Sequence, residues 1–172
     1  MALTYVGFNV VFTTLLFAAG FRAMEFSSSA MEPTLIKGDR FLIDRNRYRY
    51  KPCDRDDLVV TRIEGGMTVK RVIAVSGDTI EGRSRQVLVN GHSLDEPFVQ
   101  HTLQPGTNPE QDTFGPIVVS EGKYFVMGDN RDVSRDSRSS DFGEVDRRVI
   151  AGKPLFIYLS LHHWSRRGRR LY

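Results

Sequence analysis

The sequence predicts a small all-β domain, rich in coil, that follows an N-terminal transmembrane helix. Short β-branched or aromatic runs separated by turn residues indicate the β-structure, and a charge-free apolar stretch at the N-terminus indicates the helix. With 172 residues and 40% hydrophobic side chains, the chain can bury one core but is too short for two substantial soluble domains. We therefore expect an anchor at residues 1–22, a β domain at residues 23–160 and a basic tail at residues 161–172.

The N-terminal stretch from Met1 to Phe21 has no charged side chain and is apolar on all sides. About 20 such residues in a helix cross a bilayer, so a lipid bilayer is an expected partner. A cleavable signal peptide would have basic residues before its apolar region, and none is present. A buried soluble helix would show a polar face, whereas this stretch ends abruptly at Arg22 and Glu25.

The strands of the predicted β domain follow one another at short intervals. Eight runs have strand composition, at residues 41–43, 58–60, 67–69, 72–75, 87–89, 117–119, 124–127 and 155–158. Residues 87–94 predict a hairpin, because Asn90 and Gly91 favour the positive φ angles of a tight two-residue turn. Residues 102–114 are rich in Gln, Pro, Gly, Thr and Asn and predict a surface loop or insertion.

Composition excludes several kinds of site. Cys53 is the single cysteine, so no internal disulfide can form, and no Cys/His cluster has zinc-ligand spacing. A calcium loop through Asp129 and Asp132 is disfavoured by the interleaved arginines. We therefore expect no metal and no cofactor. The absence of a DNA-binding helix pair argues against nucleic acid as a partner.

The positive charge of the chain is placed unevenly. The net charge is +3, and four arginines crowd the last few residues. They are Arg166, Arg167, Arg169 and Arg170. Such a basic tail indicates a nearby anionic surface.

Four segments carry a family resemblance when they are taken together. They are Ser28 to Leu35 (Ser-Ser-Ala-Met-Glu-Pro-Thr-Leu), Gly38-Asp39, Lys70 to Asp78 and Gly128 to Arg138. In this order they resemble the conserved boxes of type I signal peptidases, and they cover most of Phe26 to Ser160. The resemblance implies a signal-peptidase-like β-fold and a membrane-bound serine endopeptidase that removes signal peptides from exported precursors.

Lys70 is the expected general base of this chemistry. Its neighbours Val69, Val72 and Ile73 suggest a strand that holds the amine against apolar walls, and burial lowers the pKa of a lysine. Taken alone, a strand lysine is more simply a solvated side chain on an outer face. The resemblance favours the base of a Ser-Lys dyad, and it places Ser134 beside the amine as the group that orients it.

The resemblance also implies supporting residues around this dyad. Arg71, Asp136 and Arg138 are expected to form a polar cluster, although the dense charges of residues 131–138 are also typical of a solvated loop, above all at Arg131, Asp132 and Arg135. Met31 is expected near the substrate pocket, and its simpler interpretation is a flexible core side chain.

Ala30 stands where the family has its nucleophilic serine, and a methyl group cannot attack a carbonyl. The Ala30 backbone N–H and the Ser28 hydroxyl can still form an oxyanion hole. Ser29 is the nearest substitute nucleophile, but in an extended segment it points away from the face of Ala30, while Ser28 shares that face at a distance of nearly 7 Å along the strand. The chain is therefore either a peptidase with an altered nucleophile or a nucleophile-less homologue, or serine-to-alanine form, that binds signal-peptide segments without cleaving them.

Charge bias and family resemblance disagree on the location of the domain. No Lys or Arg precedes the apolar stretch, and Arg22 with a cationic domain follows it, which by itself favours the cytoplasm. The resemblance implies a single-pass protein of the bacterial inner or plasma membrane with its domain on the non-cytoplasmic side, preceded by a short cytosolic leader. Long domains translocate largely regardless of charge, so we follow the resemblance. Its partners would be signal-peptide-bearing precursors and the secretion machinery.

Overall fold

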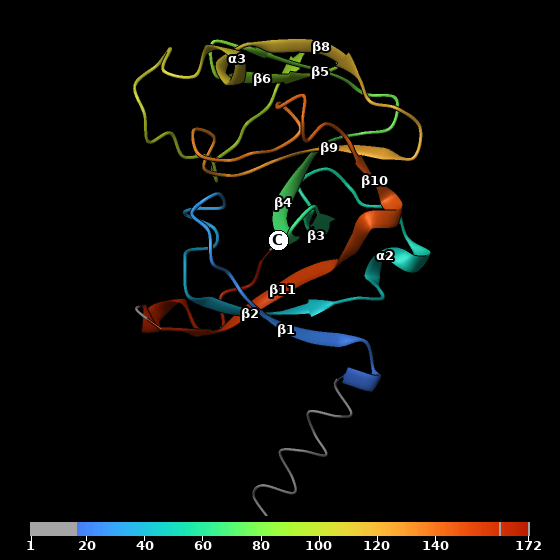
Figure 1. The fold of residues 1–172 in the computed structure, drawn as a ribbon, viewed down its shortest axis with the longest axis vertical. Helices are drawn as coiled ribbons and strands as arrows, with labels where there is room; N and C mark the ends of the chain where they lie inside the picture. The colour runs from blue at the N-terminus through green and yellow to red at the C-terminus, as the bar shows by residue number, and fades with distance from the viewer. Residues whose placement is uncertain (1–16, 162, 172) are drawn as a thin grey trace, which may run out of the picture.

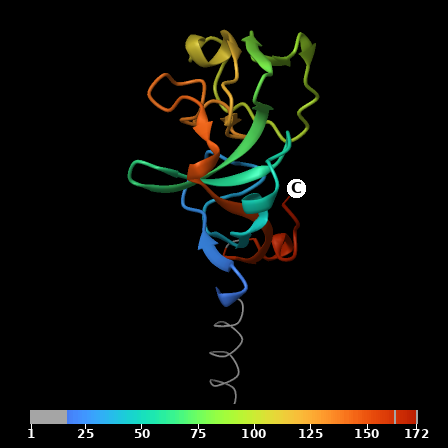
Figure 2. The same cartoon turned by 90° about the vertical axis from the view of Figure 1, so that its right-hand side faces the viewer.

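Eleven strands in two antiparallel sheets dominate residues 17–161 and 163–171, the part of the chain that the computed structural model describes. The seven-stranded sheet lies next to the N-terminal end, and the four-stranded sheet lies at the opposite end of the molecule (Figures 1 and 2). The predicted β-fold is therefore confirmed for the domain.

Every strand pairing is antiparallel within the described residues. The larger sheet contains, in order, β1 (Phe21–Glu25), β2 (Asp39–Asp44), β11 (Ile150–Ser160), β3 (Leu58–Ile63), β4 (Gly66–Val75), β9 (Lys123–Met127) and β10 (Val145–Asp146). The smaller sheet contains β7 (His92–Ser93), β6 (Gln86–Val89), β5 (Thr79–Arg83) and β8 (Phe114–Val118).

Strand β4 is the long strand that the sequence predicted as two separate runs. It continues without a break through Lys70 and Arg71, so that runs 67–69 and 72–75 are one element. It pairs with β3 from Gly66 to Arg71 and with β9 from Arg71 to Val75. Figure 1 shows β4 extending from the larger sheet toward the smaller one. Lys70 and Arg71 interrupt the apolar pattern of this strand in the sequence, but both side chains are buried in the structure.

The predicted hairpin at residues 87–94 is confirmed. Asn90 and Gly91 adopt φ angles of 53° and 78°, and Val89 pairs with His92. Strand β5 was missed because Glu81, Gly82 and Arg83 have weak strand propensity. Gly82 is required there, because a Cβ atom would collide with the Phe114 ring.

The predicted loop at residues 102–114 is irregular for most of its length. It contains the short helix α3 (Pro109–Asp112), and β8 already begins at Phe114. The other short helical elements are α2 (Arg47–Tyr50), η1 (Arg147–Val149) and η2 (Trp164–Arg166).

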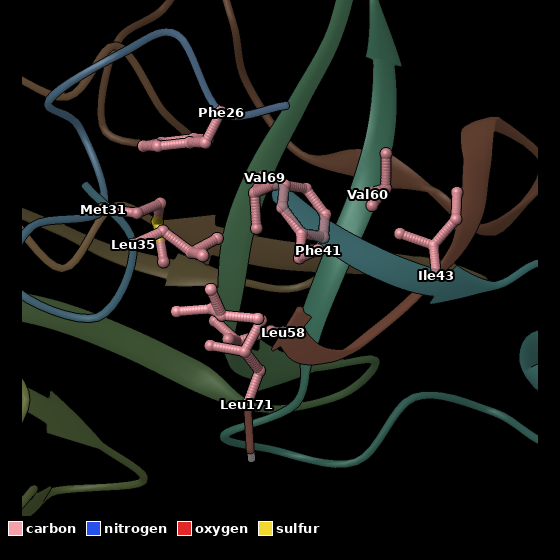
Figure 3. Close-up of a cluster of buried hydrophobic side chains, with 10 residues drawn as sticks. Phe26, Met31, Leu35, Phe41, Ile43, Leu58, Val60, Val69 and Leu171 are labelled. Atoms are coloured by element: carbon pink, nitrogen blue, oxygen red, sulfur yellow. The ribbon is translucent and has the colours of Figure 1, made fainter. Parts of the chain in front are cut away.

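A compact cluster of buried apolar side chains packs against the larger sheet. Met31 and Leu35 come from the segment before β2, and they pack with side chains of β2, β3 and β4 (Figure 3). Leu171, near the C-terminal end, belongs to the same cluster. Cys53 lies in a neighbouring cluster, where burial raises the pKa of its thiol to about 12. Cys53 is thus an inert structural thiol.

The predicted anchor at residues 1–22 lies mostly outside the described residues. At its described end, Phe17 and Ala18 are helical, the chain turns at Ala19 and Gly20, and Phe21 already belongs to β1. The boundary at residue 22 was therefore placed too late, because β1 pairs with β2 along its whole length. Among the residues that the structure describes, no helix has the length and apolar character needed to span a membrane.

The C-terminal segment, predicted as a basic tail at residues 161–172, is packed on the domain. The Gly168 N–H donates to the Ile157 carbonyl at 2.8 Å, and the Leu171 N–H donates to the Leu155 carbonyl at 2.8 Å. The Arg166 guanidinium pairs with the buried Asp39 carboxylate at 2.8 Å. A buried carboxylate needs a cation, so this arginine is part of the fold rather than a free surface charge.

Candidate active site

The Lys70 amine is enclosed inside the domain. Only 2% of Lys70 is exposed, and its Nζ donates a hydrogen bond to Ser134 Oγ at 2.7 Å. Burial lowers the pKa of Lys70 to about 8, although the nearby Asp136 carboxylate acts in the opposite direction. Roughly a tenth to a fifth of the amine is therefore neutral near physiological pH, far more than for an ordinary lysine, and the neutral form is the one that can accept a proton.

A buried ion pair lies beside this amine. Arg138 Nε and Nη2 donate to the two Asp136 oxygens at 2.8 and 2.9 Å, and the Gly128 N–H donates to Asp136 at 3.0 Å. Burial alone would raise the pKa of Asp136, but the bonds and charge of Arg138, the Gly128 N–H and the charge of Lys70 hold this pKa below its ordinary value. Asp136 therefore stays ionised and fixes the segment that carries Ser134.

Arg71 forms a second buried ion pair, which the sequence did not predict. Its Nε and Nη2 donate to the Asp129 carboxylate at 2.8 and 2.7 Å, and Thr34 Oγ1 donates to the same carboxylate. The carboxylate that pairs with Arg71 is thus Asp129, whereas Asp136 pairs with Arg138. Its guanidinium also stacks over the Phe98 ring at 3.7 Å. Asp129 belongs to the segment Gly128 to Arg138 that carries the family resemblance. This was the sequence signal from which its role as the partner of Arg71 could have been predicted.

Gly128 brings the segment of Ala30 close to Ser134. A Cβ atom at position 128 would collide with both Ser134 Oγ and the Ala30 carbonyl oxygen. The Asn130 N–H also donates to the Ala30 carbonyl at 3.1 Å. Lys70, Ser134 and Ala30, which are far apart in the sequence, therefore meet at the end of β9.

Known proteins are similar to this chain over most of its length. Residues 2–159 match the family described as signal peptidase, peptidase S26. The chain belongs to this family. It is 37% identical over 133 residues to signal peptidase I S of Bacillus subtilis (strain 168), covering 75% of this chain and 72% of that protein. It is 34% identical over 157 residues to signal peptidase I of Bacillus licheniformis, covering 87% and 82%.

A crystal structure of a signal peptidase I from Enterococcus faecalis is also similar, with a TM-score of 0.49 and 30% identity over 60% of this chain and 97% of that one. The family predicted from the four sequence segments, the type I signal peptidases, is thus confirmed by the sequence relatives.

The nucleophile segment of this signal peptidase family member is a turn and not the extended segment that we predicted. The Glu32 N–H donates to the Ser29 carbonyl at 3.2 Å, and the Leu35 N–H donates to the Met31 carbonyl at 2.9 Å. The contacts of Thr34 with Asp129 and of the Ala30 carbonyl with Asn130 bend the chain here. The alternation of side chains in a strand therefore does not decide where Ser28 and Ser29 point.

The side chains of this turn have different surroundings. Ala30 is buried, whereas Ser28 and Ser29 are exposed. The Ala30 N–H donates to Ser28 Oγ at 3.1 Å. Within residues 17–161 and 163–171, the Ser29 hydroxyl makes no hydrogen bond to Lys70, whose amine contacts Ser134 instead. Met31 is 0% exposed and belongs to the core cluster. This fits the simpler interpretation of Met31 as a core side chain, because a fully buried side chain does not line an open pocket.

The charged segment at residues 131–138 is largely buried. Arg131 is enclosed and pairs with Glu96, and Asp132 accepts hydrogen bonds from two backbone N–H groups of the 102–114 loop. Only Arg135 fits the solvated interpretation, because it pairs with Asp141 at the surface. The alternating charges of residues 131–138 suggested a solvated loop, whereas most of them form specific buried ion pairs.

Proposed function

We propose that this chain is a membrane-anchored member of the type I signal peptidases whose site binds the signal peptides of exported precursors, with Lys70 as the general base. The observation that carries the proposal is the 2.7 Å contact of the buried Lys70 amine with Ser134, at the point where Gly128 brings in the Ala30 backbone. Burial and a lowered pKa are what a lysine base requires.

An extended peptide has a strand edge available beside this amine. Between Gly66 and Val69, β4 pairs with β3 on one side, while on the other side β9 begins to pair only at Arg71. The backbone groups of Gly66 to Val69 on that second side can pair with a substrate in β-sheet fashion. Such binding would lead the scissile bond toward Lys70, the next residue of the strand.

The backbone at position 30 can support transition-state charge. The Ala30 N–H and the Ser28 hydroxyl already contact each other at 3.1 Å. Because Ser28 is exposed, its hydroxyl can rotate to donate to a developing oxyanion together with the Ala30 N–H. A serine at position 30 would transfer its proton to Lys70 and attack the carbonyl carbon of the scissile bond. The C–N bond then breaks, the leaving amine takes the proton from Lys70, and water hydrolyses the acyl-enzyme that remains.

In the chain as given, the geometry favours binding without cleavage. Ala30 is the buried residue that contacts Gly128 and lies next to Ser134, and its side chain has no oxygen. Ser29 is exposed and is not hydrogen-bonded to Lys70. The function that follows is capture of signal-peptide segments by a peptidase site with its base in place.

A second candidate is cleavage with Ser29 as the substitute nucleophile. One observation favours it: residues 29–35 form turns, so the strand alternation that would direct Ser29 away from the base does not apply. In this candidate, the turn shifts by one residue so that Ser29 takes the place of Ala30 and its hydroxyl points toward Lys70.

For both candidates we propose the same location. The apolar stretch from Met1 to Phe21 anchors the chain in a bacterial inner or plasma membrane as a single pass, with the domain on the non-cytoplasmic side. Signal peptides leave the translocation machinery at that surface. The bilayer and the secretion machinery are therefore the expected partners.

A cleavage assay distinguishes the candidates. The detergent-solubilised full chain and its Ser28→Ala, Ser29→Ala and Lys70→Ala variants are incubated with a precursor that has an Ala-x-Ala site, and the products are identified by mass spectrometry. We expect binding without cleavage for the full chain. Cleavage that is lost in both Lys70→Ala and Ser29→Ala would instead establish Ser29 as the nucleophile. Failure to bind any signal peptide would refute the proposed function.

A further inference from the structure

Five arginines line one cavity far from the candidate active site. The cavity has a volume of about 610 Å³ and lies between the N-terminal end of the described chain, the β2–α2 turn and the start of β11. The arginines come from three separate parts of the chain, and they are Arg45 and Arg49, Arg62, and Arg147 and Arg148. Ligand sites commonly have volumes of about 300–1,000 Å³.

The charge of this cavity is not balanced by the protein. No Asp or Glu is among its lining residues, and Arg148 alone of the five has an ion pair within the described residues, with Asp146 at 2.7 Å. Arg147 donates to the Tyr48 carbonyl at 3.2 Å, which fixes its side chain at the cavity without neutralising it. The five exposed guanidinium groups give this cavity a positive potential, which favours a bound anion.

The cavity lies where the chain leaves its apolar N-terminal stretch. Phe17, Ala18 and Gly20 line it, and they belong to the last five residues of the charge-free stretch from Met1 to Phe21. The Arg45 N–H donates to the Gly20 carbonyl at 3.0 Å, and the Asn46 side chain donates to the Ala19 carbonyl at 3.2 Å. These bonds tie the β2–α2 turn to that exit point, at the end of the molecule opposite the four-stranded sheet (Figure 1).

We propose that this arginine cavity binds the phosphate of an anionic phospholipid headgroup. Guanidinium groups match phosphate oxygens with paired N–H donors, and basic residues beside a membrane segment favour anionic lipids. A headgroup is the anion available at the point where an anchored chain leaves the bilayer. This inference rests on the membrane anchoring proposed above and not on the peptidase chemistry, since the cavity shares no residue with the site of Lys70.

Binding is measured with the full chain in a neutral detergent, so that its location in a cell does not affect the result. The probes are dihexanoylphosphatidylglycerol, dihexanoylphosphatidylcholine and inorganic phosphate, and the readouts are a binding isotherm and the midpoint of thermal unfolding. We expect the phosphatidylglycerol to bind and to raise the unfolding midpoint, because a ligand that binds only the native state stabilises it. The phosphatidylcholine and inorganic phosphate should give no comparable shift.

Two double variants show whether this cavity is responsible. Arg45→Gln with Arg62→Gln removes two guanidinium groups that make no hydrogen bond within the described residues, and we expect it to weaken phosphatidylglycerol binding by about thirtyfold. Arg169→Gln with Arg170→Gln removes the same charge from exposed positions outside the cavity, and it should leave the affinity unchanged.

Three results would overturn the headgroup site. They are an absence of phosphatidylglycerol binding, an equal loss of affinity in both double variants, which indicates general surface attraction, and inorganic phosphate binding as tightly as the lipid, which indicates a free-anion site. Each of these leaves the peptidase proposal untouched, because signal-peptide binding is measured separately.

Discussion

At the scale of single residues, the candidate site combines a buried lysine with a neighbouring serine and has an alanine at position 30. Lys70 is held in a buried position that disfavours its charged form, and Ser134 contacts its amine. Ala30 presents a backbone N–H but no side-chain oxygen at the point where these groups meet. The chain therefore bears the cost of burying this lysine, which the proposed role of Lys70 as a general base would explain.

This cost predicts how stability depends on pH. The pKa of Lys70 is about 8 in the folded chain, compared with 10.5 for an ordinary lysine, so between these values the unfolded chain binds more protons and stability rises with pH. We expect Lys70→Met to be more stable than the parent below about pH 8, with the difference falling by about 3 kcal/mol as the pH rises toward about 10.5.

Urea unfolding at a series of pH values measures this difference. The matched control is Lys37→Met, which replaces an exposed lysine just before β2. Parallel pH curves for the parent and Lys70→Met would show that the amine carries no burial penalty.

At the scale of elements, the end of β9 and the turn at residues 29–35 depend on each other. Gly128 has no side chain because Ser134 Oγ and the Ala30 carbonyl occupy that space, and Asp129 joins Arg71 of β4 to Thr34 of the turn. These contacts are long-range in sequence. The four sequence segments predicted the residues involved. The extended conformation expected around Ala30 was wrong, because the local sequence contains no information about which distant groups bend the chain there.

Gly128→Ala tests this dependence. The new methyl group must displace Ser134 or the Ala30 backbone, and we expect a loss of about 1–3 kcal/mol in unfolding free energy. In an Ala30→Ser background, cleavage should fall by about a hundredfold, since a displacement near 1 Å has that effect on catalysis. Gly122→Ala is the control, because position 122 has a φ of 71° but free space around it. It should lower stability and leave cleavage intact, and equal losses of cleavage would refute the account.

At the scale of the whole molecule, the C-terminal segment closes the domain around the nucleophile turn. Arg166 donates to the Thr34 carbonyl at 2.7 Å and pairs with Asp39, while Leu171 belongs to the same core cluster as Met31 and lies next to Leu58 (Figure 3). Composition alone predicted a basic tail at residues 161–172. It could not show that Arg166 pairs with the buried Asp39 carboxylate, because the two residues are more than a hundred positions apart in the sequence. The predicted strands were more reliable, since alternation and turn residues are local signals.

Arg166→Gln should destabilise the chain by about 3 kcal/mol, because it leaves the buried Asp39 carboxylate without its cation. The shift of the urea midpoint measures this loss. Arg167→Gln removes the same charge from an exposed neighbour and should have an effect of less than about 1 kcal/mol. If the two variants are equally stable, the C-terminal segment does not hold the turn.

The most direct test of the central claim is single-turnover cleavage of an Ala-x-Ala precursor by the Ala30→Ser variant, from about pH 6 to about pH 10. The account predicts no cleavage by the parent chain, and cleavage by Ala30→Ser that rises with an apparent pKa of about 8 and disappears when Lys70→Met is added. Cleavage by the parent, or a folded Ala30→Ser variant that binds the precursor and leaves it intact, would contradict the claim that one oxygen separates this site from a working Ser-Lys peptidase.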